Sequence, residues 1–128
     1  MGYTIGKTVQ MTFDAAIAKV TAELKKEEMG VLTEIDFKAK LKEKLGVDFR
    51  PYTVLGACIP KLAFRALQAE PLIGVMLPCN VIVQQSAPGE VRIDAVDPLA
   101  SMQAIQNPEL MDVALEVKAR LERVVKNC

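Results

Sequence analysis

Histidine is absent from this chain of 128 residues, and neither sign of charge is in excess. The chain therefore lacks the side chain that most often transfers protons and binds metals near neutral pH, and it has no Ser-His or Cys-His pair. Sixteen acidic residues balance sixteen basic ones, which removes the strong positive field of a protein that binds the nucleic-acid backbone. The composition predicts no nucleic-acid partner and does not indicate a familiar kind of enzyme.

Long apolar segments are also missing. No stretch reaches the roughly 18 apolar residues that span a bilayer, and even PLIGVMLPCNVIV is short and broken by prolines. The first ten residues, MGYTIGKTVQ, lack the basic start and the continuous apolar stretch of a secretion signal. We therefore expect no membrane contact and a cytoplasmic location.

Cysteine is scarce and odd in number, because the chain has three. An odd number of thiols in the cytoplasm argues against a disulfide scaffold. Two internal cysteines without histidine fall short of the four ligands of a closed zinc site, so we assign no metal; a site completed by a second subunit stays open. The GxxxxGK[ST], GxGxxG and EF-hand patterns are missing as well. The sequence identifies no cofactor and no catalytic residue.

What the chain does contain is enough apolar sequence for one core. Apolar residues make up 51% of it and charged residues 25%, so burial can offset the entropy lost on ordering. A length of 128 residues suits one domain and would be cramped for two. We therefore treat residues 1–128 as a single domain.

The first half of the chain alternates strand and helix signals. Residues 3–11 are β-compatible, and Thr12 can cap a helix that we expect to stop at Gly30. The strand candidate VLTEID follows, and Asp36 can cap a second helix that stops at Gly46. The inward stripes of these two helices are formed by Phe13, Ile17, Val20 and Leu24, and by Phe37, Leu41 and Leu45.

The second half begins with a buried strand, YTVLGACI, and a helix that starts at Pro60 and runs to about Glu70. The runs CNVIVQQ and VRIDAV, separated by residues 86–90, predict a hairpin. Asn107 and Pro108 then begin a final helix with a long apolar stripe. This order predicts an α+β fold: a mostly antiparallel sheet with helices packed largely on one face.

Two cysteines lie where chemistry is conceivable. Cys58 closes a strand just before Pro60, and the N-terminus of the helix that follows would lower its thiol pKa. Cys79 lies between Pro78 and Asn80, and the two thiols meet only if their strands are neighbours. Three interpretations compete: buried apolar filler, which is favoured, a redox or thiolate role, and the lining of a pocket.

Three aspartates and one arginine are further candidates. Asp36 is explained as a helix cap, and Asp97 before Pro98 as a turn residue, although Asp94 and Asp97 together could do acid-base work. Arg65 lies within the helix KLAFRALQAE and could reach an anionic ligand, but a solvated arginine is the commoner outcome. Sequence spacing alone does not show that any of these side chains converge.

Four stretches of the chain carry a family resemblance: VLTEIDFKAKLKEKLG, YTVLGACIPKLAFRALQAEP, IGVMLPCNVIV and the hairpin ending IDAVDP. Together they resemble the domain of unknown function 302 family over nearly the whole chain. Its most distinctive parts are the run from Gly56 to Pro71 and the run LPCNV, and the chain departs from the family pattern at Ile59, where asparagine is more usual.

The resemblance implies a curved antiparallel sheet, similar to that of the TATA-binding protein, covered by helices, and it implies a homodimer. It implies no established reaction. The positions that match its motifs are Cys58, Pro60, Pro78, Cys79 and Asn80. We take these five as the candidate site for a small ligand or for redox chemistry.

Three functions remain open at this point. The favoured hypothesis is a homodimeric accessory module that binds a small ligand or a partner near the GAC and LPCN segments. The second is a thiol-dependent role in redox or sulfur handling that uses Cys58 and Cys79. The third is a purely structural dimerisation module.

Overall fold

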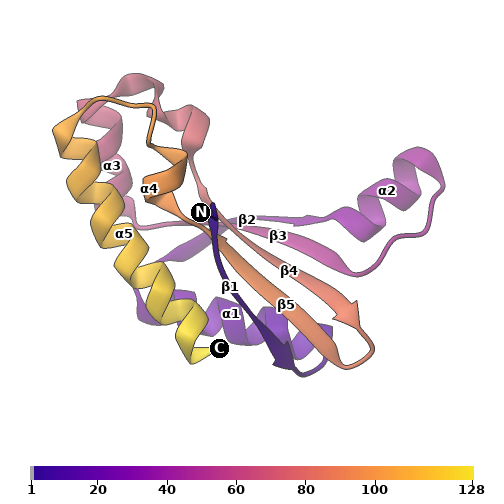
Figure 1. The fold of residues 1–128 in the computed structure, drawn as a ribbon. Coiled ribbons are helices and arrows are strands. Elements are labelled where there is room, and N and C mark those ends of the chain that lie inside the picture. The colour runs from indigo at the N-terminus through magenta and orange to yellow at the C-terminus, as the bar shows by residue number, and fades with distance from the viewer. Residues whose placement is uncertain (1) are drawn as a thin grey trace.

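A five-stranded antiparallel sheet forms the centre of the computed structural model, which describes residues 2–128 (Figure 1). The strand order is β1-β5-β4-β3-β2, so the first strand of the chain lies beside the last. Each neighbouring pair is antiparallel, which confirms the predicted sheet. The strands are β1 (Thr4–Gln10), β2 (Gly30–Asp36), β3 (Tyr52–Cys58), β4 (Cys79–Ala87) and β5 (Glu90–Val96).

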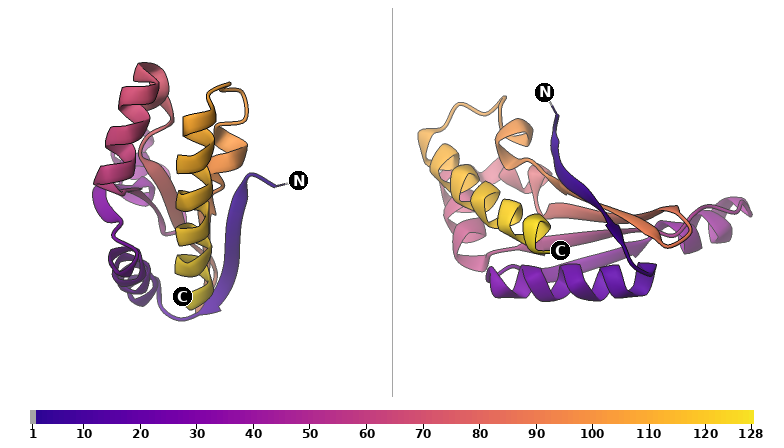
Figure 2. Two further views of the ribbon diagram at one scale, coloured as in Figure 1. Left: turned by 90° about the vertical axis from the view of Figure 1, so that its left-hand side faces the viewer. Right: turned by 60° about the horizontal axis from the view of Figure 1, so that its bottom comes forward.

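Three long helices cover one face of this sheet, as Figures 1 and 2 show. They are α1 (Phe13–Lys26), α3 (Pro60–Ala69) and α5 (Pro108–Asn127). Side chains of the central strands alternate between the two faces, and those that point toward the helices are buried with them in one core. Within residues 2–128 no helix combines the length and the apolar character that a bilayer span requires.

The predicted helix starts are confirmed by their capping hydrogen bonds. Thr12 Oγ1 accepts from the Ala15 N–H at 3.2 Å, and Asp36 Oδ1 accepts from the Ala39 N–H at 2.9 Å. The Asn107 side chain caps α5 in the same way. Each cap satisfies a backbone donor that the first turn of a helix leaves without a partner.

The end of α1 differs from the prediction. The helix stops at Lys26 rather than at Gly30, and Glu28, with a φ of 62°, takes the left-handed conformation. The Met29 N–H then bonds back to the Leu24 carbonyl at 2.9 Å, and the Met29 side chain is buried in the core. Reversing the chain this early buries a large apolar side chain and leaves Gly30 free to pair with Cys58 at the start of β2.

Two short helices had no counterpart in the prediction. A 3₁₀ helix, η1 (Pro71–Met76), follows α3, and the Glu70 side chain caps it by accepting from the Leu72 N–H. The four-residue helix α4 (Pro98–Ser101) follows β5 and is capped by Asp97. Both begin with a proline and are too short to show a periodic apolar stripe in the sequence.

The helix α2 (Phe37–Leu45) stands apart from the body of the domain. Together with the loop that follows, it forms a projection beyond the ends of β2 and β3, which we call the arm (residues 36–51; Figure 1). Gly46, with a φ of 68°, ends α2 as predicted. None of the α2 residues is buried, so this helix does not cover the sheet as the other three do.

The second face of the sheet has none of the three long helices on it, and we call it the open face. The pairing of β3, β4 and β5 sets Tyr52, Gln84 and Arg92 side by side across it. The next row consists of Val54, Ile82 and Asp94. The half of the open face near the arm is therefore apolar, and the half near β5 is polar.

Candidate functional site

Cys58 and Cys79 are brought together by the sheet. Strands β3 and β4 are neighbours, and Cys79 pairs with Ala57, the residue before Cys58. Both cysteines line one cavity of about 30 Å³ between the sheet and the helices, little more than the space of a water molecule. Its other walls are almost wholly apolar and include Met29, Leu62 and Val113. This setting suits a packed core more readily than a metabolite.

The pKa of Cys58 is shifted in the direction opposite to the one expected from the helix that follows it. Burial raises the pKa of Cys58, and burial together with the charge of Cys58 raises the pKa of Cys79 to about 11. Cys58 precedes the first turn of α3, but apolar side chains line the cavity that it shares, and desolvation of the thiolate is the cause of its raised pKa. A redox role for the pair stays a prediction without an activated thiolate to support it.

We expect both thiols to be poor nucleophiles near neutral pH. Iodoacetamide should modify Cys58 and Cys79 slowly in the folded protein, and the rate should rise as the pH approaches the raised pKa values. Mass spectrometry after timed quenching would measure this, with urea-denatured protein as the control in which both thiols react freely. Rapid labelling of either cysteine in folded protein at pH 7 would contradict the expectation.

The other three predicted site residues lie elsewhere. Pro78 and Asn80 line a separate cleft of about 220 Å³ together with Val96 and Ser101. Asn80 is exposed, because neighbouring positions of β4 point to opposite faces of the sheet and Cys79 takes the inner one. Pro60 is exposed at the first turn of α3 and lines neither space. The five predicted positions therefore do not form one site.

The aspartates have separate partners. Asp97 caps α4 through the Leu99 N–H at 3.0 Å and accepts from Lys118 Nζ at 3.0 Å. Burial would raise the pKa of Asp97, but these hydrogen bonds outweigh it, and the pKa is lowered overall. Asp94 is bound by Arg92 instead, so each of the two carboxylates has its own cationic partner. Arg65 forms an ion pair with Glu109 at 3.7 Å.

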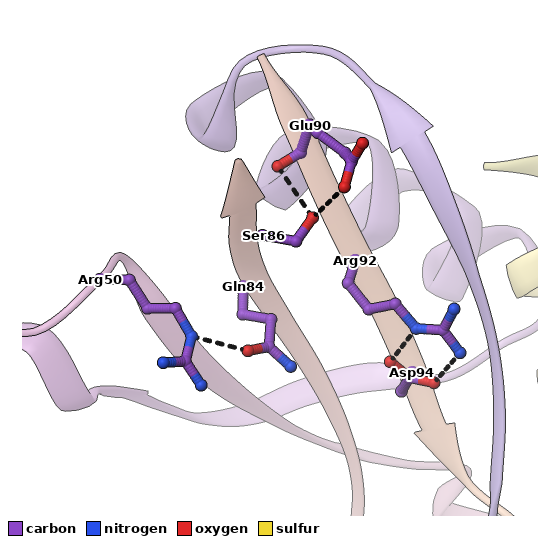
Figure 3. A network of polar contacts seen from close by, with 6 residues as sticks. All are labelled: Arg50, Gln84, Ser86, Glu90, Arg92 and Asp94. Atoms are coloured by element: carbon purple, nitrogen blue, oxygen red, sulfur yellow. Dashed lines mark hydrogen bonds and ion pairs between the residues drawn. The ribbon is translucent and has the colours of Figure 1, made fainter. Parts of the chain in front are cut away.

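A row of polar side chains crosses the open face (Figure 3). Arg92 binds Asp94 through two hydrogen bonds of 2.9 and 3.0 Å, which raise the pKa of the guanidinium. On β4, Gln84 accepts from Arg50 Nε at 2.9 Å, and the Ser86 hydroxyl donates to Glu90 Oε1 at 2.8 Å. Asp94 is only 7% exposed although no long helix covers this face. These are three separate contacts, and only the one between Arg50 and Gln84 joins the arm to the sheet.

Three aromatic rings stand at the base of the arm, and the sequence argument did not single them out. Phe37 starts α2, Phe49 lies in the loop after it, and Tyr52 starts β3. They line an open cleft of about 440 Å³ together with Leu41 and Val54. One signal was available in the sequence, since these are three of only six phenylalanines and tyrosines and all fall between positions 37 and 52.

Potential metal ligands are not gathered in the part of the chain that the structure describes. Within residues 2–128 no three cysteine, aspartate or glutamate side chains are close enough to hold an ion. The three cysteines are free thiols.

These features define a small α+β domain with helices on one face of an antiparallel sheet, an open second face and a projecting arm. Residues 5–128 match the family model described as "Domain of unknown function DUF302". The chain therefore belongs to the DUF302 family, which confirms the resemblance in its motifs.

A solved structure supports the same assignment. The fold is similar to the crystal structure of an uncharacterized conserved DUF302 protein from Bacillus stearothermophilus, with a TM-score of 0.91 and 29% sequence identity. The likeness covers 100% of this chain and 99% of the other. No match was found among curated proteins.

Proposed function

We propose that this domain is a homodimeric binding module without a catalytic centre of its own. Support comes above all from α2, a helix of nine residues with no buried side chain. An isolated helix this short is marginal in water, and most helical stability in proteins comes from packing of an apolar face. Leu45, which is 69% exposed, and Val47 lie uncovered at the end of the arm. A second copy of the chain is the occupant that we propose for them.

Charge complementarity favours a second copy over an unrelated partner. The helix α2 contains four lysines and one glutamate, a net charge of +3. The chain as a whole has sixteen residues of each sign, so twelve basic and fifteen acidic residues remain outside α2, a net charge of −3. The whole arm, residues 36–51, contains five basic and three acidic residues, so its net charge is +2 and that of the body is −2. A basic arm on one protomer is therefore attracted to the acidic body of another, and a two-fold axis would repeat the contact.

The oligomeric state tests this proposal. Light scattering coupled to size exclusion should give twice the 14.0 kDa of one chain. Leu45→Glu places a charge in the proposed contact on both protomers, and burial of one leucine contributes roughly 1.5–3 kcal/mol. We expect the variant to weaken dimerisation by a factor of about a hundred or more.

Leu72→Glu is the matched control, because Leu72 is also highly exposed but lies on η1 at a distance from the arm. It should leave the dimer intact. A mass of one chain for the wild type at all concentrations, or equal dissociation by both variants, would refute the arm-mediated dimer.

Ligand binding near Pro78 and Asn80 stays part of the proposal. Their cleft of about 220 Å³ can admit a small molecule, whereas the cavity between Cys58 and Cys79 cannot hold one without repacking. A cytoplasmic location also belongs to the proposal and is in keeping with three free thiols.

A further inference from the structure

The aromatic cleft at the base of the arm has the size of a small-molecule site. Its volume of about 440 Å³ falls inside the span of roughly 300–1,000 Å³ that is typical of ligand pockets. One chain supplies all of its walls, from α2, the following loop and β3.

The three rings are set at different angles. Phe37 meets Tyr52 edge to face, with ring centroids 6.0 Å apart and planes at 87°. Phe49 and Tyr52 are 6.2 Å apart with planes at 50°. Tyr52 thus contacts both phenylalanines directly, and the cleft lies against this cluster rather than between its rings. A flat ring in the cleft can stack on one ring face or meet one ring edge, the two arrangements that aromatic pairs prefer. The shape of the cleft therefore favours a planar aromatic group.

Arg50 adds a positive charge beside these rings. Its guanidinium carbon lies 4.4 Å from the centroid of Phe49 and 5.8 Å from that of Tyr52. Only its Nε is engaged, by Gln84, so both Nη groups lack a hydrogen bond or ion pair with any of residues 2–128. A planar guanidinium with two free N–H edges suits an oxyanion, which it can bind in a bidentate manner.

Two lysines of the arm stabilise the loop that carries Phe49 and Arg50. Lys38 Nζ donates to the Phe49 carbonyl at 2.8 Å, and Lys42 Nζ pairs with Asp48 at 3.2 Å. Both contacts hold the loop that places Phe49 and Arg50. Lys38 also keeps a positive charge close to the cleft, because its partner is a neutral carbonyl, whereas the charge of Lys42 is offset by Asp48.

We propose that this cleft binds a small planar aromatic anion. The ring of the ligand lies in the cleft against Phe37, Phe49 and Tyr52. Its carboxylate, sulfonate or phosphate pairs with the free Nη groups of Arg50, which does not line the cleft itself but stacks on Phe49 beside it. The inference rests on the proposed function, since it names an occupant for the binding module. The cleft belongs to one chain, however, and Leu45, the proposed dimer contact, does not line it.

A titration of the full chain with 2-naphthoate tests the proposal. Amide chemical shifts in ¹⁵N-labelled protein should change in a saturable way and mainly between residues 37 and 54. Naphthalene-2-methanol, which has the same rings without the charge, should bind about tenfold more weakly, because the charge-assisted hydrogen bonds to Arg50 are lost.

Variants of Arg50 test whether this side chain binds the anionic group of the ligand. Arg50→Gln should weaken 2-naphthoate binding about tenfold and leave the affinity for the neutral alcohol unchanged. The affinity of Arg50→Lys for 2-naphthoate should lie between those of the wild type and Arg50→Gln. Arg65→Gln is the matched control, because Arg65 is a partly exposed arginine paired with Glu109 outside the arm, and it should bind as wild type. The amide spectrum of each variant shows whether the fold is kept.

Several results would overturn the inference: no saturable shift, shifts centred outside the arm, or equal binding of the acid and the alcohol. The titration also shows whether the second copy covers the cleft in the dimer. In that case 2-naphthoate would bind to the monomeric Leu45→Glu variant and not to the dimer. A wild-type chain that is monomeric but binds 2-naphthoate through Arg50 would refute the dimer and uphold the cleft.

Discussion

Replacement of Gly6 by alanine is expected to destabilise the domain by about 2–4 kcal/mol. Gly6 lies on β1 directly opposite Asp94 of β5. A Cβ atom at this position would overlap the Asp94 carboxylate and come within 2.8 Å of the Ile93 carbonyl oxygen. The backbone oxygen cannot move away without breaking the β1–β5 ladder, and the carboxylate cannot move without leaving Arg92. Urea-induced unfolding followed by circular dichroism would measure the loss.

Gly30→Ala is the matched control for this substitution. Gly30 is also a strand glycine, but a Cβ there would meet no atom within 4 Å. The change in unfolding free energy should stay within about 1 kcal/mol, because removing a glycine mainly restricts the unfolded chain. The double variant Gly6→Ala with Asp94→Ala should be less destabilised than the sum of its parts, since the second change removes the overlap. An unaltered stability of Gly6→Ala would show that β1 pairs differently.

Leu121→Ala is expected to cost about 2–5 kcal/mol of unfolding free energy. The Leu121 side chain has no solvent exposure and lies on the face of α5 that packs into the core. Its truncation loses apolar burial and leaves a cavity among well-packed neighbours, which relax only in part. Thermal and urea unfolding should both show the effect, with a clearly lower midpoint.

Leu115 provides the comparison on the same helix. It is 50% exposed, on the side of α5 turned away from the core. Leu115→Ala should change stability by less than about 1 kcal/mol, because alanine and leucine have similar helix propensities and little burial is lost. Equal losses for the two variants would mean that α5 packs through a different face.

Those parts of the fold that depend on local sequence were predicted from it. Thr12, Asp36 and Asn107 cap their helices through hydrogen bonds that reach only two or three residues along the chain. Gly46 and Gly89 are local signals too, because each takes a positive φ at the end of α2 and in the turn between β4 and β5. Such signals are readable because both partners of each interaction lie within one turn.

Features set by contacts between distant segments were not predicted. The end of α1 depends on the burial of Met29 in a core to which most other elements contribute. The separation of α2 from the sheet could not be seen either, because its apolar stripe of Phe37, Leu41 and Leu45 looks like that of a core helix. An amphipathic pattern predicts that a face is covered but not what covers it.

The candidate site shows the same limit. That Cys58 and Cys79 meet follows from the register of β3 and β4, which sequence does not give, and their raised pKa values follow from burial. The rows of the open face likewise exist only once three strands are aligned. Phe49 and Arg50 come from an irregular loop whose path depends on hydrogen bonds to Lys38 and Gln84.

The pairing of β1 with β5 has a consequence for synthesis of the protein. Gln10 pairs with Glu90, so the two strands emerge from a ribosome roughly 80 residues apart. At about 5–20 residues per second, β1 waits on the order of 4–16 seconds for its neighbour. During that interval Ile5 and Val9 have no sheet to join, although β2, β3 and β4 can already assemble. The nascent chain thus leaves its first strand without its sheet partner until the hairpin of β4 and β5 is complete.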